Sequence, residues 1–220
     1  MPHGRRSDLI NVRDLEVLEF IARFGVVPRE AVASWSRAGR SVSYERERRL
    51  RLAGLLVVEP GPRPGERLLS ATRQGLRACG RPDLAPVRRS PATLRHDALA
   101  SCLAARLEAA GERLLSEREI GAAERAAAAR IYSAELADGR PHRADLIRLG
   151  PTGAEAIEVE LTTKGAARLD ALLRAWRLAV AERRLCGVVY HCAPRTRRLV
   201  EAAIERTATG RMVGAVDVEL

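Results

Sequence analysis

The 220 residues carry 38 Lys and Arg against 28 Asp and Glu, a net charge of +10, and 46% of them are hydrophobic. A chain of this length can form one large or two small domains with apolar cores. It has no run of about 18 apolar residues that could cross a membrane, and residues 1–10 lack the apolar stretch of a signal peptide, so we expect a cytoplasmic protein without membrane contact.

The four cysteines are scattered without a CxxC pair, which argues against a zinc site and against a disulfide framework. Positive charge is concentrated in the first part of the chain. Residues 1–90 hold 18 Arg against 10 acidic residues, whereas residues 91–220 hold 20 Lys and Arg against 18. A basic part joined to a nearly balanced one indicates that the first part contacts phosphates; a general solubility charge is the alternative.

Apolar periodicity predicts three helices near the amino terminus, over residues 12–24, 29–35 and 42–53. Gly25 and Gly54 fit the ends of the first and the third, Pro28 opens the second, and Ser41 is expected to cap the third. Residues 55–58 and 67–70 then predict a β-hairpin with Arg63 at its tip, and residues 72–76 begin a closing helix.

This order predicts a winged helix-turn-helix domain over residues 1–80 that binds double-stranded DNA, followed by a linker over residues 81–91. We expect Ser43, Tyr44 and Arg48 near base edges and the other arginines on phosphates. The expected DNA-binding residues are Arg40, Ser41, Ser43, Tyr44, Arg48, Arg51, Arg63 and Arg67. Winged helices often dimerise on palindromes, so a homodimer is compatible with this interpretation. A solvated arginine face or a protein-binding winged helix is the alternative.

Residues 92–220 are predicted to form an α/β (α+β) second domain. Its expected elements are helices 93–110, 166–184 and 196–207 and strands 113–120, 143–149, 156–164, 186–192 and 212–218. Glu117 and Glu119 would then lie on a solvated strand face. Residues 121–141, which are first Ala-rich and then turn-like, match no element.

Two carboxylates share one face of the strand over residues 156–164. Side chains two apart on a strand point the same way, so Glu158 and Glu160 lie opposite Ile157 and Val159. Carboxylates on an apolar strand need a metal ion, a basic partner or a proton. Asp145 completes an oxygen-rich site for magnesium or manganese if its strand pairs alongside.

Lys164 is the only lysine in the chain. Its compact ammonium has a tunable pKa, a role that a guanidinium cannot fill. The alternative to a metal site is an acidic cluster neutralised by arginines that are near in sequence, namely Arg143, Arg148 and Arg168.

With Asp145 on one strand and Glu158 to Glu160 on the next, the predicted order resembles the αβββαβ core of the PD-(D/E)XK nuclease superfamily. The resemblance implies that an Asp and the acid of the E-x-K motif hold a divalent metal while a lysine positions or activates water. Ala144 stands where the family has proline, and Glu160 stands where it has the lysine, so Lys164 would be a migrated lysine. These departures favour a nuclease-like domain that does not cleave.

The whole chain also resembles the plasmid replication-relaxation family of bacterial DNA-associated proteins. The resemblance covers most of the chain and rests on short motifs, which are residues 49–55, residues 72–75, His96, residues 117–119 and residues 158–161. It implies DNA binding linked to replication, transfer or transcription of mobile DNA. Two hypotheses follow: a DNA-binding regulator of a mobile element, or a magnesium- or manganese-dependent endonuclease that uses Asp145, Glu158, Glu160 and Lys164. A protein-interaction adaptor is the third.

Overall fold

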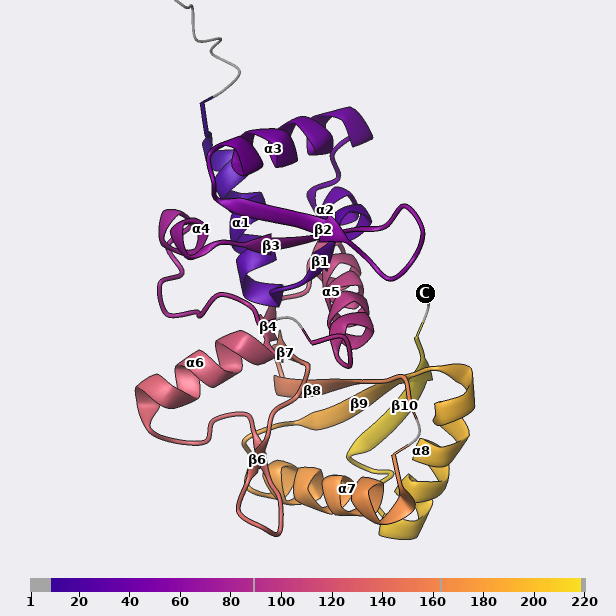
Figure 1. The fold of residues 1–220 in the computed structure, drawn as a ribbon. Coiled ribbons are helices and arrows are strands. Elements are labelled where there is room, and N and C mark those ends of the chain that lie inside the picture. The colour runs from indigo at the N-terminus through magenta and orange to yellow at the C-terminus, as the bar shows by residue number, and fades with distance from the viewer. Residues whose placement is uncertain (1–8, 89, 163, 219–220) are drawn as a thin grey trace, which may run out of the picture. The chain divides into compact units, whose positions relative to one another are not determined.

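The computed structural model describes residues 9–88, 90–162 and 164–218. The chain divides into two compact units, residues 1–110 and 111–220, and each combines helices with β-sheet (Figure 1). The expected mixed α/β class is therefore confirmed. Within the described ranges, no helix has the length and apolar character that crossing a membrane requires.

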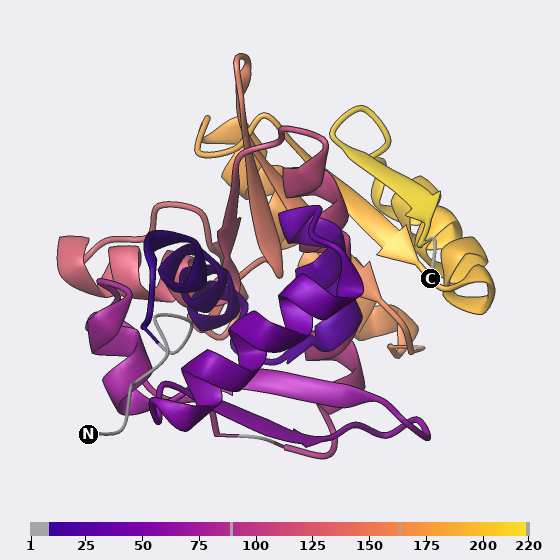
Figure 2. The ribbon, with the colours of Figure 1, turned by 90° about the horizontal axis from the view of Figure 1, so that it is seen from above.

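The described residues of the first unit form five helices and a small sheet. In chain order its elements are α1 (Val12–Phe24), β1 (Val27–Pro28), α2 (Arg29–Ser36), α3 (Arg40–Leu52), β2 (Leu56–Pro60), β3 (Arg67–Ala71), α4 (Arg73–Ala78) and α5 (Leu94–Ala109). Strand β3 lies in the middle of an antiparallel sheet, between β1 and β2. Helix α3 lies beside the β2–β3 hairpin in both views (Figures 1 and 2).

Helix α1 supplies much of the core of the first unit. Its start is fixed by a capping box, in which the Asn11 side chain accepts a hydrogen bond from the Asp14 N–H and the Asp14 carboxylate accepts one from the Asn11 N–H. The side chains of Leu18, Phe20 and Ile21 are almost completely buried. The apolar residues from whose periodicity this helix was predicted thus pack inward.

Helix α3 begins at Arg40, and its N-cap is Gly39, which forms no side-chain hydrogen bond. The prediction that Ser41 caps this helix is wrong, because Ser41 lies in the first turn. At the other end Gly54 has a φ of 69°, a left-handed conformation that glycine adopts at low cost. The predicted end of the helix at Gly54 is therefore confirmed.

Helix α5 belongs to the first unit, whereas the sequence analysis placed it at the start of the second domain. It packs against α2 and β1. The indole N–H of Trp35 donates a 2.8 Å hydrogen bond to Glu108, and Arg23 forms a 2.7 Å ion pair with the same carboxylate. Periodicity shows that a helix has an apolar face, but it does not show which domain covers that face. Because α5 belongs to the first unit, residues 81–91 connect two helices of that unit and are not a linker between domains.

The second unit is built around a mixed sheet with strand order β10-β9-β8-β7-β4. Its elements are β4 (Leu114–Ser116), α6 (Glu117–Ala127), β5 (Ala134–Glu135), β6 (Pro141–His142), β7 (Leu146–Gly150), β8 (Gly153–Glu160), α7 (Ala166–Ala181), β9 (Gly187–Cys192), α8 (Pro194–Thr207) and β10 (Val213–Asp217). Strands β4, β7 and β8 are antiparallel, whereas β8, β9 and β10 are parallel and are joined by the crossover helices α7 and α8.

The strand predicted over residues 113–120 is wrong in its second half. Strand β4 ends at Ser116, and α6 begins at Glu117. The Ser116 hydroxyl accepts a hydrogen bond from the Glu119 N–H, while the Glu119 carboxylate accepts one from the Ser116 N–H. This capping box starts a helix because it satisfies two backbone donors at once, so Glu119 is a capping residue.

Candidate nucleic-acid interface and acidic cluster

Four of the residues expected at DNA are exposed on α3: Arg40, Ser41, Tyr44 and Arg51. Tyr44 keeps 51% of its surface exposed, whereas Leu50 on the opposite side of the helix is fully buried. Arg48 is half-buried, and its guanidinium lies 3.0 Å from the Glu45 carboxylate. Helix α3 therefore presents polar and cationic groups to solvent while its apolar side holds it on the core.

Two other arginines of the first unit serve to hold α3 in place. Arg49 donates hydrogen bonds of 2.7 and 3.0 Å to the fully buried carboxylate of Asp14 on α1. Arg29, at the start of α2, donates bonds of 2.6 and 2.8 Å to Glu47. The hydrogen bonds to these carboxylates raise the pKa of both guanidinium groups. These fork-like pairs fix the rotation of α3 about its axis.

Ser43 does not occupy the position that the sequence analysis gave it. Its hydroxyl is buried and forms no hydrogen bond within the described part of the chain. It lines a narrow internal space with Val17, Ile21 and Leu50. A side chain that points into the core cannot reach a base edge, so this expected DNA contact is corrected. The burial of Leu50 sets the rotation that turns Ser43 inward.

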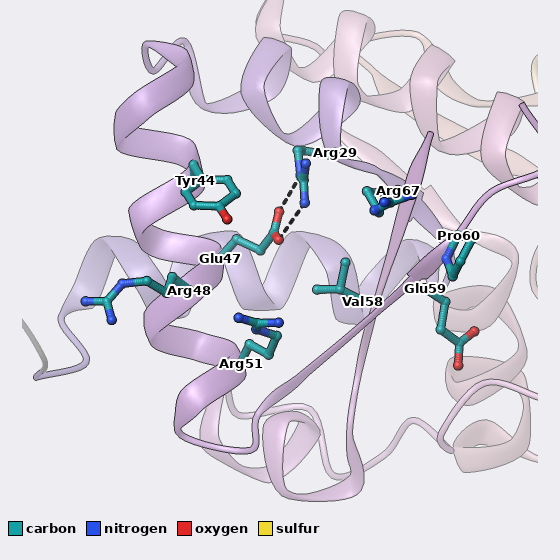
Figure 3. Close-up of a pocket in the computed structure, with 9 residues that line it drawn as sticks. All are labelled: Arg29, Tyr44, Glu47, Arg48, Arg51, Val58, Glu59, Pro60 and Arg67. Atoms are coloured by element: carbon teal, nitrogen blue, oxygen red, sulfur yellow. Dashed lines mark hydrogen bonds and ion pairs between the residues drawn. The ribbon is translucent and has the colours of Figure 1, made fainter. Parts of the chain in front are cut away.

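A groove separates α3 from the β2–β3 hairpin (Figure 3). It has a volume of about 280 Å³. One wall is α3, the other is formed by β2 and Arg67 of β3, and Arg29 of α2 also reaches it. The lining residues are Arg29, Tyr44, Glu47, Arg48, Arg51, Val58, Glu59, Pro60 and Arg67. Four arginines against two carboxylates make this a basic groove suited to an anion.

Arg63 and Arg67 of the hairpin are both exposed. Arg67 donates a 3.1 Å hydrogen bond to the Glu66 carbonyl, and the backbone N–H of Arg63 donates one of 3.1 Å to the Glu66 carboxylate. Arg63 borders a different cavity, of about 780 Å³, between the hairpin tip and α5. The two hairpin arginines expected on phosphates therefore line different sites of the first unit: Arg67 lines the groove beside α3, and Arg63 lines the cavity beside α5.

Asp145 and Glu158 of the second unit are neighbours across β7 and β8. The register pairs Leu146 with Ile157, and continuing it by one residue places Asp145 opposite Glu158. The Asp145 carboxylate accepts a 2.7 Å hydrogen bond from the Val159 N–H. Asp145 therefore closes the end of the β7–β8 pair and lies beside Glu158.

Glu158 and Glu160 are each only 4% exposed. Their register partners on β9 are Tyr190 and Cys192, whose side chains belong to the main apolar core of the second unit. Because residues paired in register point to the same face, both carboxylates point into this core; the alternation in the sequence predicted that they share a face. Each must then have a partner that offsets its desolvation.

The partner of Glu158 is His142, whose Nε2 lies 2.9 Å from the Glu158 Oε1. Burial raises the pKa of the Glu158 carboxyl, and the charge of His142 opposes that rise only in part. Burial lowers the pKa of His142, but attraction to Glu158 outweighs burial and the pKa lies above its ordinary value. The imidazole of His142 also stands edge-on to Trp176, with ring centres 5.6 Å apart.

The partner of Glu160 is Lys164, which forms an ion pair and hydrogen bond with it. Two polar atoms beside this cluster, the Trp176 Nε1 and the Tyr190 hydroxyl, are buried without a hydrogen-bond partner among the described residues. Burial, and then the charges of Glu158 and Glu160, raises the pKa of Tyr190 well above its ordinary value. The neutral phenol is therefore the form present at physiological pH.

In the described ranges the carboxylates of this cluster are engaged by other groups of the protein. No three His, Cys, Asp or Glu residues of the described ranges lie in an arrangement that could hold a metal ion. Glu158 is engaged by His142, Glu160 by Lys164, and Asp145 by the backbone of β8. The three carboxylates therefore have protein partners, and the magnesium or manganese site expected from Asp145, Glu158 and Glu160 stays a prediction.

Two of the arginines expected to neutralise this cluster pair with other carboxylates. Arg143 lies 3.3 Å from the Glu124 carboxylate, and Arg148 pairs with Glu155. His142 is the residue that sequence reasoning missed. Two buried glutamates imply a nearby cation, and the sole imidazole within ten residues of Asp145 is His142. That signal was hidden because β6 is two residues long and shows no periodicity.

No family model, no curated protein and no solved structure matches the chain.

Proposed function

We propose that this protein binds duplex DNA through a winged helix-turn-helix formed by its first unit. The order α1-β1-α2-α3-β2-β3, with β3 between β1 and β2, supports this architecture. The observation that carries the proposal is the basic groove between α3 and the hairpin, which Tyr44 and Arg51 line, with Arg40 exposed at the start of the same helix. An exposed arginine face beside a hairpin suits the phosphates and major groove of DNA.

The second unit is, in this proposal, a PD-(D/E)XK-like domain that does not cleave. Three antiparallel strands followed by a helical crossover to a parallel strand support that resemblance. Its role would be dimerisation, sensing or clamping of DNA. The biological setting we propose, from the resemblance described above, is control of replication or transcription of a plasmid or another mobile element.

Fluorescence anisotropy with a labelled duplex tests DNA binding directly. We expect wild type to bind with a dissociation constant in the range of about 10⁻⁴–10⁻⁶ M for non-specific DNA at physiological salt, and more weakly as salt rises. Arg40→Gln should weaken binding. Arg77→Gln, which removes the same charge from α4 outside the groove, is the matched control. Absence of binding by folded wild type at moderate salt overturns the proposal and favours a protein-interaction adaptor.

The second candidate function is a magnesium- or manganese-dependent endonuclease. The adjacency of Asp145 and Glu158 favours it, whereas the ion pairs of Glu158 and Glu160 count against it. Incubation of supercoiled plasmid with wild type and either metal separates the two. Metal-dependent nicking that is lost in Glu158→Gln would establish the nuclease; DNA that is shifted by the protein but stays intact supports the binding protein.

A further inference from the structure

We infer that the groove between α3 and the β2–β3 hairpin holds a single backbone phosphate of DNA, bound jointly by Arg51 from the helix and Arg67 from the hairpin. This inference rests on the proposed DNA binding and names the contact that joins helix and hairpin. The bound group is a phosphodiester of one strand.

The two walls of the groove come from segments that are separate in the chain. Tyr44, Glu47 and Arg51 repeat at helical spacing along α3 and so share the face turned to the hairpin. Val58 of β2 and Arg67 of β3 form the facing wall. Figure 3 shows Arg51 and Arg67 on either side of Val58, so their guanidinium groups approach the groove from opposite walls.

The remaining arginines of the groove already have carboxylate partners. Arg29 is held by two hydrogen bonds to Glu47, and its guanidinium lies 5.5 Å from the ring centre of Tyr44. Arg48 is paired with Glu45. Their charges are therefore offset within the unit, and their geometry is fixed before any ligand arrives.

Arg51 and Arg67 differ in that neither has a carboxylate partner in the part of the chain that the structure describes. Both are exposed. A guanidinium without a carboxylate keeps its donors for a ligand, and two such groups facing one hollow favour an anion that can accept bonds from two directions. The tetrahedral oxygens of a phosphate meet that requirement.

The number of phosphates can be counted from the salt dependence of binding. The logarithm of the DNA association constant falls with the logarithm of salt concentration by about 0.9 per phosphate neutralised. We expect the double variant Arg51→Gln/Arg67→Gln to lose about 0.9 from this slope, which is one phosphate. If each arginine bound its own phosphate, the loss would be about twice as large.

Two further variants keep the test informative. Arg51→Lys/Arg67→Lys retains both charges and should restore the wild-type slope, which excludes misfolding as the cause. Arg13→Gln/Arg77→Gln removes two exposed charges that do not line the groove and should leave the slope unchanged. A loss near two phosphates, or none, in a variant of a protein that does bind DNA overturns the shared contact alone. Failure of wild type to bind DNA overturns the proposed function and this inference together.

Discussion

The imidazole of His142 and the carboxylate of Glu158 form a largely buried pair in the core of the second unit, with Nε2 and Oε1 2.9 Å apart. The two groups come from different strands, β6 and β8, which lie in different sheets. The pair therefore ties the β5–β6 hairpin to the central sheet. It also places a titratable cation within electrostatic reach of Asp145 and Lys164.

The first prediction concerns the pKa of His142. Attraction to Glu158 holds this pKa above its ordinary value against the effect of burial. In Glu158→Gln the imidazole of His142 stays buried but loses the attraction of the Glu158 carboxylate, so we expect the pKa of His142 to fall. Titration of the imidazole protons by NMR measures this. Glu155→Gln on the same strand, whose partner is Arg148, should leave the pKa of His142 where it was.

The same pair predicts how stability depends on pH. A histidine whose folded pKa exceeds its unfolded value of about 6.5 stabilises the protein most at low pH, and this stabilisation is lost as pH rises through the folded pKa. We therefore expect the wild-type free energy of unfolding to fall above about pH 6.5. In Glu158→Gln this fall in the free energy of unfolding with rising pH should be smaller or reversed, which urea unfolding at several pH values measures. The same fall in wild type and variant would contradict the pairing of His142 with Glu158.

Loss of the Asp14 carboxylate should strongly destabilise the first unit. Asp14 is fully buried and binds Arg49 through two hydrogen bonds while it also caps α1. Breaking a buried pair leaves an unpaired charge, which costs about 3–5 kcal/mol. Urea denaturation of Asp14→Ala measures this loss. Glu16→Ala, which removes the exposed partner of Arg13, should change stability by less than about 1 kcal/mol.

Gly75 tolerates no side chain. A Cβ at this position would lie 2.1 Å from the Leu55 carbonyl oxygen, a backbone atom that cannot move aside alone. We expect Gly75→Ala to destabilise the protein by about 1–3 kcal/mol or more. Gly39→Ala is the comparison, since nothing lies within 4 Å of its added Cβ. Equal melting temperatures for the two variants would show that the backbone around Leu55 and Gly75 relaxes freely.

Arg48 and Arg40 should affect DNA recognition differently. Arg48 remains the arginine expected near base edges, so Arg48→Ala should cost about 1–3 kcal/mol on the preferred sequence and relax the preference. Arg40 is expected on phosphate, so Arg40→Ala should weaken all duplexes alike. Selection from a random duplex library, followed by affinity measurements, compares the two variants. Identical sequence preferences in wild type and Arg48→Ala would contradict the role of Arg48.

Short-range patterns predicted most of the elements. The alternation over residues 156–160 placed Glu158 and Glu160 on one face because a strand repeats every two residues. The serine and glutamate at positions 116 and 119 carried a helix-start signal that was outweighed by apparent alternation around Arg118. Where two local patterns compete over so few residues, the sequence does not decide between them.

Tertiary contacts could not be predicted from the sequence in the same way. The role of His142 depends on a contact 16 residues away in the chain. The inward turn of Ser43 depends on how Leu50 is buried against α1, since both lie on α3 and rotate together. Such features arise from packing between two helices or strands. The spacing of residues within one helix or strand carries no information about that packing.

Helix α5 has a practical consequence for dissecting the protein. A fragment that ends in the proline-containing segment after α4 lacks α5. In that fragment Trp35 loses its hydrogen bond to Glu108, and Arg23 loses its ion pair with the same residue. We expect such a fragment to aggregate through its exposed apolar surface. Absence of DNA binding by that fragment would therefore not test DNA binding by the intact unit. Cutting after Ala110 keeps the first unit whole for crystallisation or NMR.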